Sequence, residues 1–241
     1  MIIWGLFDSE TATVAKALPE HEVYSFGIGG GTEHIHLDLS DFETARKELE
    51  KYPKPDVIFA SPPCETWISL SSGNLRFYKE KGRNLYWKDK WNPFDFNEKQ
   101  RKRRMNGVNT ALTTARIIQH FNSRYWAIEN GSSSLIFDYM KDFANLVGIK
   151  SKCRYSAYDF NVLKPTIIYS NVLLCLKTSI PMKDYIAITE GDTRSIKKKF
   201  NIRILITKKN KEDRIEACKV PPLLYRDIMC QFKHGRQKTL F

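Results

Sequence analysis

Short apolar or alternating runs are separated by amphipathic segments over most of the chain. Such runs, bounded by turn residues, are typical of strands buried in a parallel sheet, and they fall at residues 2–7, 22–26, 56–60, 125–128 and 166–169. Apolar positions at helical spacing predict helices over residues 13–18, 41–52, 109–121, 134–147 and 222–232. Strands that alternate with helices predict an α/β sheet, whose ligands bind beyond the carboxyl ends of the strands.

Two segments break this alternation. Residues 71–104 are rich in lysine, arginine and aromatic side chains and have no clean helical or strand period, and the chain is basic again beyond residue 176. No internal repeat is evident. These changes divide the sequence into an α/β domain over residues 1–176 with an insertion at 71–108, a small basic region over 177–215, and a closing helix with a tail over 216–241.

The composition narrows the class of protein. With 241 residues and 42% hydrophobic content, the chain can bury a real core and is expected to form one domain with at most a small appendage. No apolar stretch approaches the ~20 residues of a membrane span, and the first ten residues lack the features of a signal peptide. With 39 basic and 27 acidic side chains the net charge is +12, which favours nucleic acid as a partner over a surface charged only for solubility.

The five cysteines include no Cys-x-x-Cys pair, which argues against a disulfide framework and against a thiolate zinc site. This usage predicts a reducing compartment, so we expect a cytoplasmic protein. Any special cysteine is then a nucleophile rather than a metal ligand, although most free cysteines simply pack. His34 and His36 alternate near Asp38, but two imidazoles without a clear third ligand are more often a polar surface pair, and no metal is expected.

Two of the expected strand ends carry reactive side chains. Cys64 follows the run at 56–60 through Ser61-Pro62-Pro63, and Glu129 follows the run at 125–128. Parallel strands end at the same edge of a sheet, so a thiol and a carboxyl placed in this way can act on one substrate. Each residue also has a simpler interpretation, because a cysteine can be a packed small hydrophobe and a loop glutamate a solvated charge.

Together and in this order, these segments resemble the DNA (cytosine-5) methyltransferases, particularly their short phage-encoded members. Pro63-Cys64 resembles the nucleophile motif of that family, and Glu129-Asn130 its Glu-Asn motif. Further likenesses span most of the chain: Leu6-Phe7-Asp8 at the cofactor loop, Ala157-Tyr158-Asp159-Phe160, the Lys-Pro-Thr strand at Lys164–Asn171, and Lys219–Arg226 before the last helix. The resemblance implies a Rossmann-like, S-adenosylmethionine-dependent methyltransferase fold with a small basic recognition region, the catalytic domain being residues 1–176.

The chemistry implied by the resemblance needs a thiolate and a carboxyl around one pyrimidine. Addition of Cys64 to C6 of cytosine breaks the aromaticity of the ring and makes C5 nucleophilic toward an electrophilic methyl group. Glu129 would hold or protonate ring N3, a role suited to a carboxyl that is shielded from water, while Asn130 would orient the loop. The target atom is inaccessible inside a stacked duplex, so the base has to be flipped out.

The resemblance also implies contacts with double-stranded DNA. Residues 71–108 take the place of the family's mobile catalytic loop, and residues 177–215 that of its target-recognition region. Basic side chains would hold phosphates and aromatic ones would fill the gap left by the flipped base. The expected DNA contacts are Trp87, Trp91, Arg101, Arg103, Arg104, Lys164, Thr166, Lys197 and Lys198. The alternative for 71–108 is a surface insertion with some aromatic side chains packed underneath.

The cofactor end departs from the family pattern. The family's Phe-x-Gly-x-Gly loop lets the backbone approach the methionine part of S-adenosylmethionine, whereas here Ser9 and Thr11 stand where glycines are expected. The acidic residue expected at the end of the second strand is replaced by Gly27-Ile28-Gly29. The expected S-adenosylmethionine contacts are Phe7, Asp8, Ser9, Thr11, Asp38 and Leu39. The alternatives are an enzyme with the same Cys/Glu chemistry and an altered cofactor or none, and a non-catalytic DNA-binding descendant.

The last five residues carry a separate hypothesis. Gln237-Lys238-Thr239-Leu240-Phe241 is similar to the Gln-x-x-Leu-Phe peptide by which bacterial DNA-processing enzymes dock on the sliding clamp. Gln237, Leu240 and Phe241 would bind the clamp, with Leu240 and Phe241 as the apolar anchors. The alternative is a helix end that packs back on the core.

Overall fold

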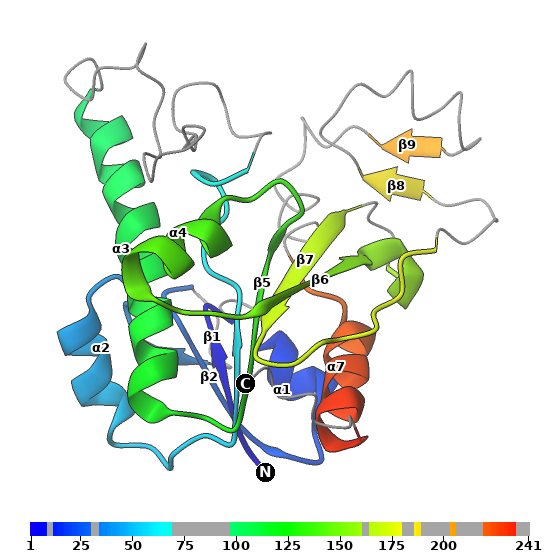
Figure 1. The fold of residues 1–241 in the computed structure, drawn as a ribbon, viewed down its shortest axis with the longest axis horizontal. Coiled ribbons are helices and arrows are strands. Elements are labelled where there is room, and N and C mark those ends of the chain that lie inside the picture. The colour runs from blue at the N-terminus through cyan, green and yellow to red at the C-terminus, as the bar shows by residue number, and fades with distance from the viewer. Residues whose placement is uncertain are drawn as a thin grey trace.

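The computed structural model describes residues 1–8, 12–29, 34–68, 97–160, 164–179, 186–188, 203–205 and 219–234. Its centre is a seven-stranded sheet in the order β3-β2-β1-β4-β5-β7-β6 (Figure 1). The strands are β1 (Ile2–Leu6), β2 (Glu22–Gly27), β3 (Ile35–His36), β4 (Val57–Ala60), β5 (Tyr125–Gly131), β6 (Ile149–Arg154) and β7 (Pro165–Ser170). The predicted α/β sheet is therefore confirmed.

Strand β7 is antiparallel to both of its neighbours, β5 and β6, whereas the other pairs are parallel. The apolar run at 166–169 is thus confirmed as a strand, but its direction is not visible in the run itself. The connection from β6 to β7 is only about ten residues long and includes the 3-10 turn η2 (Tyr155–Tyr158). A connection of this length joins antiparallel neighbours, because a parallel crossover needs a dozen or more residues.

Successive side chains of the central strands alternate between two cores. On one face, Trp4, Leu6 and Ile58 pack with the helices α2 (Phe42–Leu49), α3 (Glu98–Phe121) and α4 (Ile136–Ala144). On the other face, Ile3 and Phe59 pack with α1 (Thr13–Ala17), η2 and α7 (Pro222–His234). The sheet is thus covered on both sides (Figure 1), which is why its central strands are almost wholly apolar.

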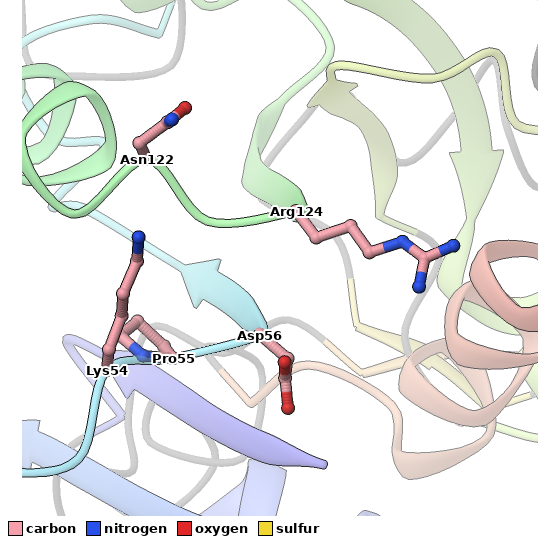
Figure 2. A pocket seen from close by; sticks show the side chains of 5 residues that line it. All are labelled: Lys54, Pro55, Asp56, Asn122 and Arg124. Carbon is pink, nitrogen blue, oxygen red and sulfur yellow. The ribbon is translucent and has the colours of Figure 1, made fainter.

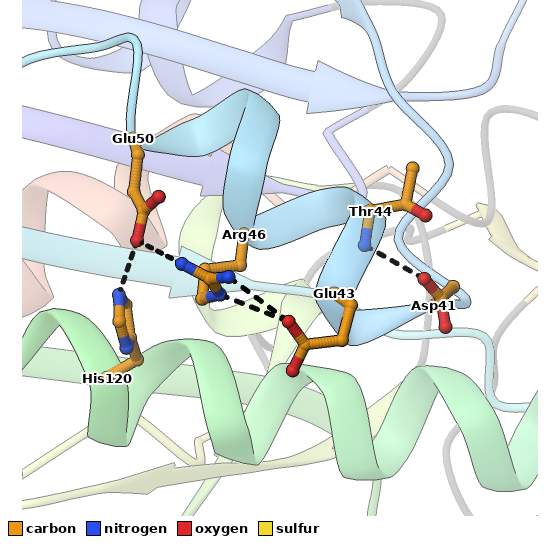
Figure 3. Close-up of polar contacts among 6 residues, drawn as sticks. All are labelled: Asp41, Glu43, Thr44, Arg46, Glu50 and His120. Carbon is orange, nitrogen blue, oxygen red and sulfur yellow. Dashed lines mark hydrogen bonds and ion pairs between the residues drawn. The ribbon is translucent and has the colours of Figure 1, made fainter.

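A polar network joins α2 to α3 on the first face (Figure 3). The Arg46 guanidinium donates to Glu43 and Glu50, and Glu50 Oε1 also lies 3.0 Å from Nε2 of His120 on α3. Asp41 accepts from the backbone N–H of Thr44 at 2.8 Å and so caps α2. These contacts cap α2 and fix its end against α3.

Helix α3 begins eleven residues before its predicted start at Asn109. A capping box at Asn97 and Gln100 starts it, because each side chain accepts a hydrogen bond from the other residue's backbone N–H, at 2.9 and 3.0 Å. The first two turns bury no side chain, and burial starts at Gly107. Without a buried face, residues 98–108 show no helical period, so assigning all of 71–108 to an irregular loop was wrong for this part.

The short strand β3 lies within the segment in which His34 and His36 alternate, whereas β6 was not predicted from the sequence. Helix α4 begins two residues later and ends three residues earlier than the predicted range 134–147. In β6, Lys150 and Lys152 alternate with the buried Ser151 and Cys153, which is the pattern of an edge strand whose outer face is charged. In the basic region 177–215, β8 (Ile186–Ile188) and β9 (Arg203–Leu205) form a parallel pair. Among the described residues, no helix has the length and apolarity to span a membrane.

Candidate functional site

The carboxyl edge of the sheet brings the two predicted reactive segments together. Ala60 at the end of β4 pairs with Ile128 of β5, so the chain after Ala60 and the pair Glu129-Asn130 lie at the same edge. The Asn130 amide donates to the backbone carbonyl of Pro62 at 3.0 Å. Asn130 is buried, and its own side-chain oxygen accepts from the backbone N–H of Gly131 at 3.1 Å. Asn130 thus links the segment before Cys64 to β5.

Cys64 stands at the start of a tight turn. Its carbonyl accepts hydrogen bonds from the backbone N–H groups of Trp67 at 2.9 Å and Ile68 at 3.2 Å, which makes residues 64–68 a single helical turn. The Cys64 side chain is half-buried and forms no disulfide, while Trp67 of the same turn is fully buried. The thiol is therefore held at the edge of the sheet without being enclosed in the core, as a nucleophile requires.

Close backbone approach explains two glycines beside this turn. A Cβ at Gly107 of α3 would lie 2.1 Å from Thr66 Oγ1, and one at Gly131 of β5 would lie 2.8 Å from Ile68 Cγ2. Both distances are below the closest contact that a real Cβ makes. The turn that carries Cys64 therefore packs closely against both α3 and β5.

An ion pair links the residue after Cys64 to α3. Arg103 binds both carboxylate oxygens of Glu65, with Nε 3.3 Å from Oε1. The hydrogen bond to Glu65 raises the pKa of Arg103 further above its usual range. Arg103 was predicted as a DNA contact, together with Arg101, which is exposed, and Arg104, which is half-buried on the same helix. The first turns of α3 project past the edge of the sheet where β4 ends (Figure 1).

Glu129 is buried under the end of the β6–β7 connection. One oxygen, Oε1, accepts a hydrogen bond from the Tyr155 hydroxyl at 2.7 Å and lies 3.2 Å from the Lys164 ammonium. That ammonium also lies 3.4 Å from the Tyr155 hydroxyl and 4.9 Å from the centre of its ring. Burial, with Glu129 next in weight, raises the pKa of Tyr155 well above its usual value, so this hydroxyl stays protonated and acts as a donor.

Sequence reasoning missed Tyr155, because nothing in its spacing connects it with Glu129. Lys164 and Thr166 are also predicted DNA contacts. The Lys164 ammonium faces Glu129, and Thr166 is buried with its hydroxyl 3.4 Å from the Lys164 carbonyl. The second thiol near this carboxylate, Cys153, is also buried. Desolvation, with a smaller contribution from Glu129, raises its pKa to about 12, so Cys153 is not a competing nucleophile.

At the predicted cofactor end, the Asp8 carboxylate binds groups of the chain itself. Its carboxylate accepts from the backbone N–H groups of Thr13 at 2.9 Å and Val14 at 3.0 Å, and from the Ser25 hydroxyl at 2.7 Å. Burial raises its pKa above the usual value, and these hydrogen bonds act in the opposite direction. Asp8 thus joins β1, β2 and the start of α1. Phe7 before it has a positive φ of 59°, which marks the sharp turn at the end of β1.

The remaining described cofactor candidates lie after β2. Asp38 is exposed and accepts the Ser40 backbone N–H at 2.8 Å through Oδ1, while Leu39 is part of the core. His36 is exposed, but both ring nitrogens of His34 are enclosed and, among the described residues, have no hydrogen-bond partner, so the expectation of a surface pair was wrong for His34. His34 also interacts electrostatically with Asp8. An enclosed imidazole without a partner fits a polar ligand at this edge, which is the chemistry that a ribose offers.

The other predicted site residues lie outside the part of the chain that the structure describes: Ser9, Thr11, Trp87, Trp91, Lys197, Lys198, Gln237, Leu240 and Phe241. Within the described part, no cluster of histidine, cysteine and carboxylate side chains could hold a metal ion. A hollow of about 280 Å³, lined by Lys54, Pro55, Asp56, Asn122 and Arg124, lies at the amino ends of β4 and β5. Its charged side chains point in different directions (Figure 2). The hollow precedes β4, whereas Cys64 follows the carboxyl end of that strand, so the two lie at opposite edges of the sheet.

No protein-family model matches the sequence, and no curated protein gives a significant match. Among solved structures, the chain is similar to an Escherichia coli prophage-encoded protein assigned as a DNA modification methyltransferase (13% identity, TM-score 0.41, covering 70% of this chain and 46% of that one). It is also similar to the Entamoeba histolytica methyltransferase EhMeth (11% identity, TM-score 0.44, covering 74% of this chain and 57% of that one). A third similar structure is a mutant of Spodoptera frugiperda DNMT2 (16% identity, TM-score 0.42, covering 76% of this chain and 56% of that one). The chain spans about half the length of these structures.

The mixed sheet of seven strands with one antiparallel member confirms the α/β class that the sequence predicts. At such low identities, the roles of individual residues are argued from the geometry of this chain alone.

Proposed function

We propose that this chain is a DNA (cytosine-5) methyltransferase that acts on a cytosine flipped out of double-stranded DNA. The observation that carries the proposal is the hydrogen bond from Asn130 to the Pro62 carbonyl, which ties the Cys64 turn to the strand that carries Glu129. Two further facts support it: Cys64 is half-buried rather than enclosed, and Glu129 is a buried carboxyl with polar partners. A thiol and a carboxyl at one edge of an α/β sheet suit nucleophilic attack on an aromatic ring.

In the proposed mechanism, the Cys64 thiolate forms a bond to C6 of the flipped cytosine while Glu129 gives a proton to N3. The electron pair of the C5=C6 bond moves to C4–C5, and C5 becomes nucleophilic. S-adenosylmethionine, when bound, supplies the methyl group that C5 attacks. A base then removes the proton from C5, the C6–S bond breaks and releases the Cys64 thiolate, N3 returns its proton to Glu129, and the ring regains its aromaticity.

The cofactor would bind at the carboxyl edge of β1, β2 and β3. Phe7 at the sharp turn and Leu39 in the core would shape the site, and Asp38 has an exposed carboxylate that can accept from an adenine amino group. The enclosed nitrogens of His34 offer hydrogen bonds to ribose hydroxyls where the family has an acidic residue. These donors and acceptors fit S-adenosylmethionine.

A second candidate is an enzyme with the same Cys64 and Glu129 chemistry and an altered cofactor. It is favoured by Asp8, whose two oxygens are already used by Thr13, Val14 and Ser25 and are therefore committed to the fold. Calorimetric titration with S-adenosylmethionine separates the two candidates, because methyl transfer requires binding and a flat titration favours the altered cofactor.

The test of the proposed reaction is the conversion of cytosine to 5-methylcytosine. DNA from cells that express the protein is read by bisulfite sequencing, beside DNA from cells that express Cys64→Ala and Cys175→Ala. Cys175 is an exposed cysteine whose backbone binds Gln231 of α7, and its variant is the matched control. We expect methylation with the wild type and Cys175→Ala and none with Cys64→Ala. Methylation that persists in Cys64→Ala would exclude this cysteine as the nucleophile.

We further propose that flipping is driven by contacts from α3, the segment 71–108 and the basic region 177–215, which offset an unstacking cost of about a few kcal/mol.

We propose a cytoplasmic location, in a bacterial or phage-infected cell, and docking on a sliding clamp through Gln237–Phe241. Removal of the last five residues should abolish pulldown of the clamp, and unchanged pulldown would reject the docking peptide.

A further inference from the structure

The two contacts of Glu129 fall on the same oxygen. Tyr155 and Lys164 both bind Oε1, and no described residue donates to Oε2. Oε2 is also not fully enclosed by the protein, so this oxygen retains some accessible surface. A carboxyl that is held by one oxygen and open at the other can present the second oxygen to a ligand in one fixed direction.

We propose that Tyr155 and Lys164 form a positioning pair that directs Glu129 Oε2 toward ring N3 of the flipped cytosine and stabilises the carboxylate that remains after proton transfer. This inference rests on the proposed function and adds to it two residues that the sequence resemblance did not connect with Glu129. Neither residue has to touch the base. Both act through Glu129.

The position of Tyr155 is rigid. Its side chain is fully buried at the start of η2, and its ring contacts Phe160 edge-on at 5.9 Å. Its backbone N–H donates to the Lys164 carbonyl at 3.2 Å, and β6 pairs with β7 next to it, Arg154 opposite Pro165. The same strand register therefore places the hydroxyl of Tyr155 and the ammonium of Lys164 on one carboxyl oxygen.

The positive charge of Lys164 beside Glu129 suits a carboxyl that acts as a proton donor. When Cys64 forms its bond to C6, electron density moves through C4 to N3, and N3 takes the proton from Oε2 of Glu129. The carboxylate left behind keeps the Tyr155 hydrogen bond and gains the full attraction of the Lys164 ammonium in a site with little water. The step is balanced, because one proton passes from Glu129 to N3 and no other group is consumed.

The experiment measures exchange of tritium from C5 of [5-³H]cytosine in DNA with solvent, without any methyl donor. Exchange requires Cys64 addition and N3 activation, so it reads this step alone. Tyr155→Phe removes one hydroxyl, and Lys164→Met removes the charge at similar length. We expect each to slow exchange by about 10- to 100-fold, the range for hydrogen bonds to charged groups, with equal binding of the same DNA. Lys164→Arg should recover most of the rate.

Rescue by arginine distinguishes positioning from a loss of structure. Lys164→Arg restores a positive charge beside Glu129, so recovery of the exchange rate in Lys164→Arg but not in Lys164→Met assigns the effect to the charge. Tyr158→Phe is the matched control, since the Tyr158 hydroxyl binds Asp227 at 2.8 Å rather than Glu129.

Two outcomes would overturn the claims separately. If Tyr155→Phe and Lys164→Met exchange tritium as fast as the wild type and Tyr158→Phe do, the positioning pair is wrong while the proposed function stands. If the wild type shows neither exchange nor methylation on any DNA, the proposed function fails and the pair fails with it.

Discussion

The side-chain amide of Asn130 donates a hydrogen bond to the backbone carbonyl of Pro62, 3.0 Å away and 68 positions earlier in the chain. Cys64 follows two residues after that carbonyl, so the placement of the proposed nucleophile depends on a residue of the next strand. Asn130 is 1% exposed, and water cannot easily replace the contact. The asparagine beside Glu129 is thus a structural link between the two reactive groups.

Asn130→Ala should impair both stability and activity. The substitution leaves the Pro62 carbonyl and the Gly131 N–H without their partner in a buried place, which costs about 1–3 kcal/mol. A misplaced thiol should also lower the methylation rate by roughly 10²-fold. Urea unfolding and a methylation assay measure the two effects. Asn109→Ala, at an exposed position of α3, is the control and should change neither.

The stability of the fold should depend on pH through Asp8. Its pKa is raised in the folded protein by burial, so the folded state binds this proton more tightly than the unfolded chain does. The contribution of Asp8 is therefore complete below its ordinary pKa of 3.8 and declines as the pH rises through the higher folded value. In urea unfolding at a series of pH values from 3 upward, the difference in stability between wild type and Asp8→Asn should shrink with rising pH.

Asp41 provides a control of the opposite sign. The hydrogen bond from Thr44 lowers the pKa of this exposed helix cap, so its contribution is present above pH 3.8 and is lost as the pH falls through the lower folded value. The stability difference between wild type and Asp41→Asn should therefore grow with rising pH. Equal pH dependence of the two variants would contradict the burial of Asp8 described here.

The sheet and its reactive edge could be predicted because they depend on local pattern. Apolar strands such as β4 are visible as runs. Cys64, which follows β4, and Glu129, near the carboxyl end of β5, must then lie at the edge where parallel strands end. The direction of β7 could not be read in the same way. An antiparallel and a parallel strand buried on both faces have the same apolar sequence, and only the short connection after β6 distinguishes them.

The partners of the reactive groups could not be predicted, because they come from distant positions. Tyr155 meets Glu129 across 26 residues, through the register of β6 and β7. Asp8 was expected to face a cofactor, yet its carboxylate turns inward to Ser25 and α1, since the backbone turns sharply at Phe7. The first turns of α3 escaped detection because they bury nothing, so no apolar period marks them.

Binding of DNA should respond to the ion pair between Glu65 and Arg103. If Arg103 holds a phosphate, Arg103→Ala should weaken binding by roughly 3- to 10-fold at low salt and reduce the slope of log affinity against log salt by about one. Glu65→Gln releases the arginine and should strengthen binding. Fluorescence anisotropy at several salt concentrations measures both. Lys102→Ala is the control, because Lys102 pairs with Glu98 at 2.6 Å on the outer face of the same helix.

Thiol reactivity should separate Cys64 from Cys153. Both thiols belong to the site region, but Cys64 is half-buried while Cys153 is 2% exposed with its pKa raised to about 12. Alkylation requires an accessible thiolate, so iodoacetamide at pH 8 should modify Cys64 and the exposed Cys175 and Cys230 long before Cys153. Peptide mass spectrometry at increasing times gives the order, and in urea all five cysteines should react. Fast labelling of Cys153 in the native protein would mean that the β6–β7 region opens, and the fixed position of Tyr155 on Glu129 would then be lost for part of the time.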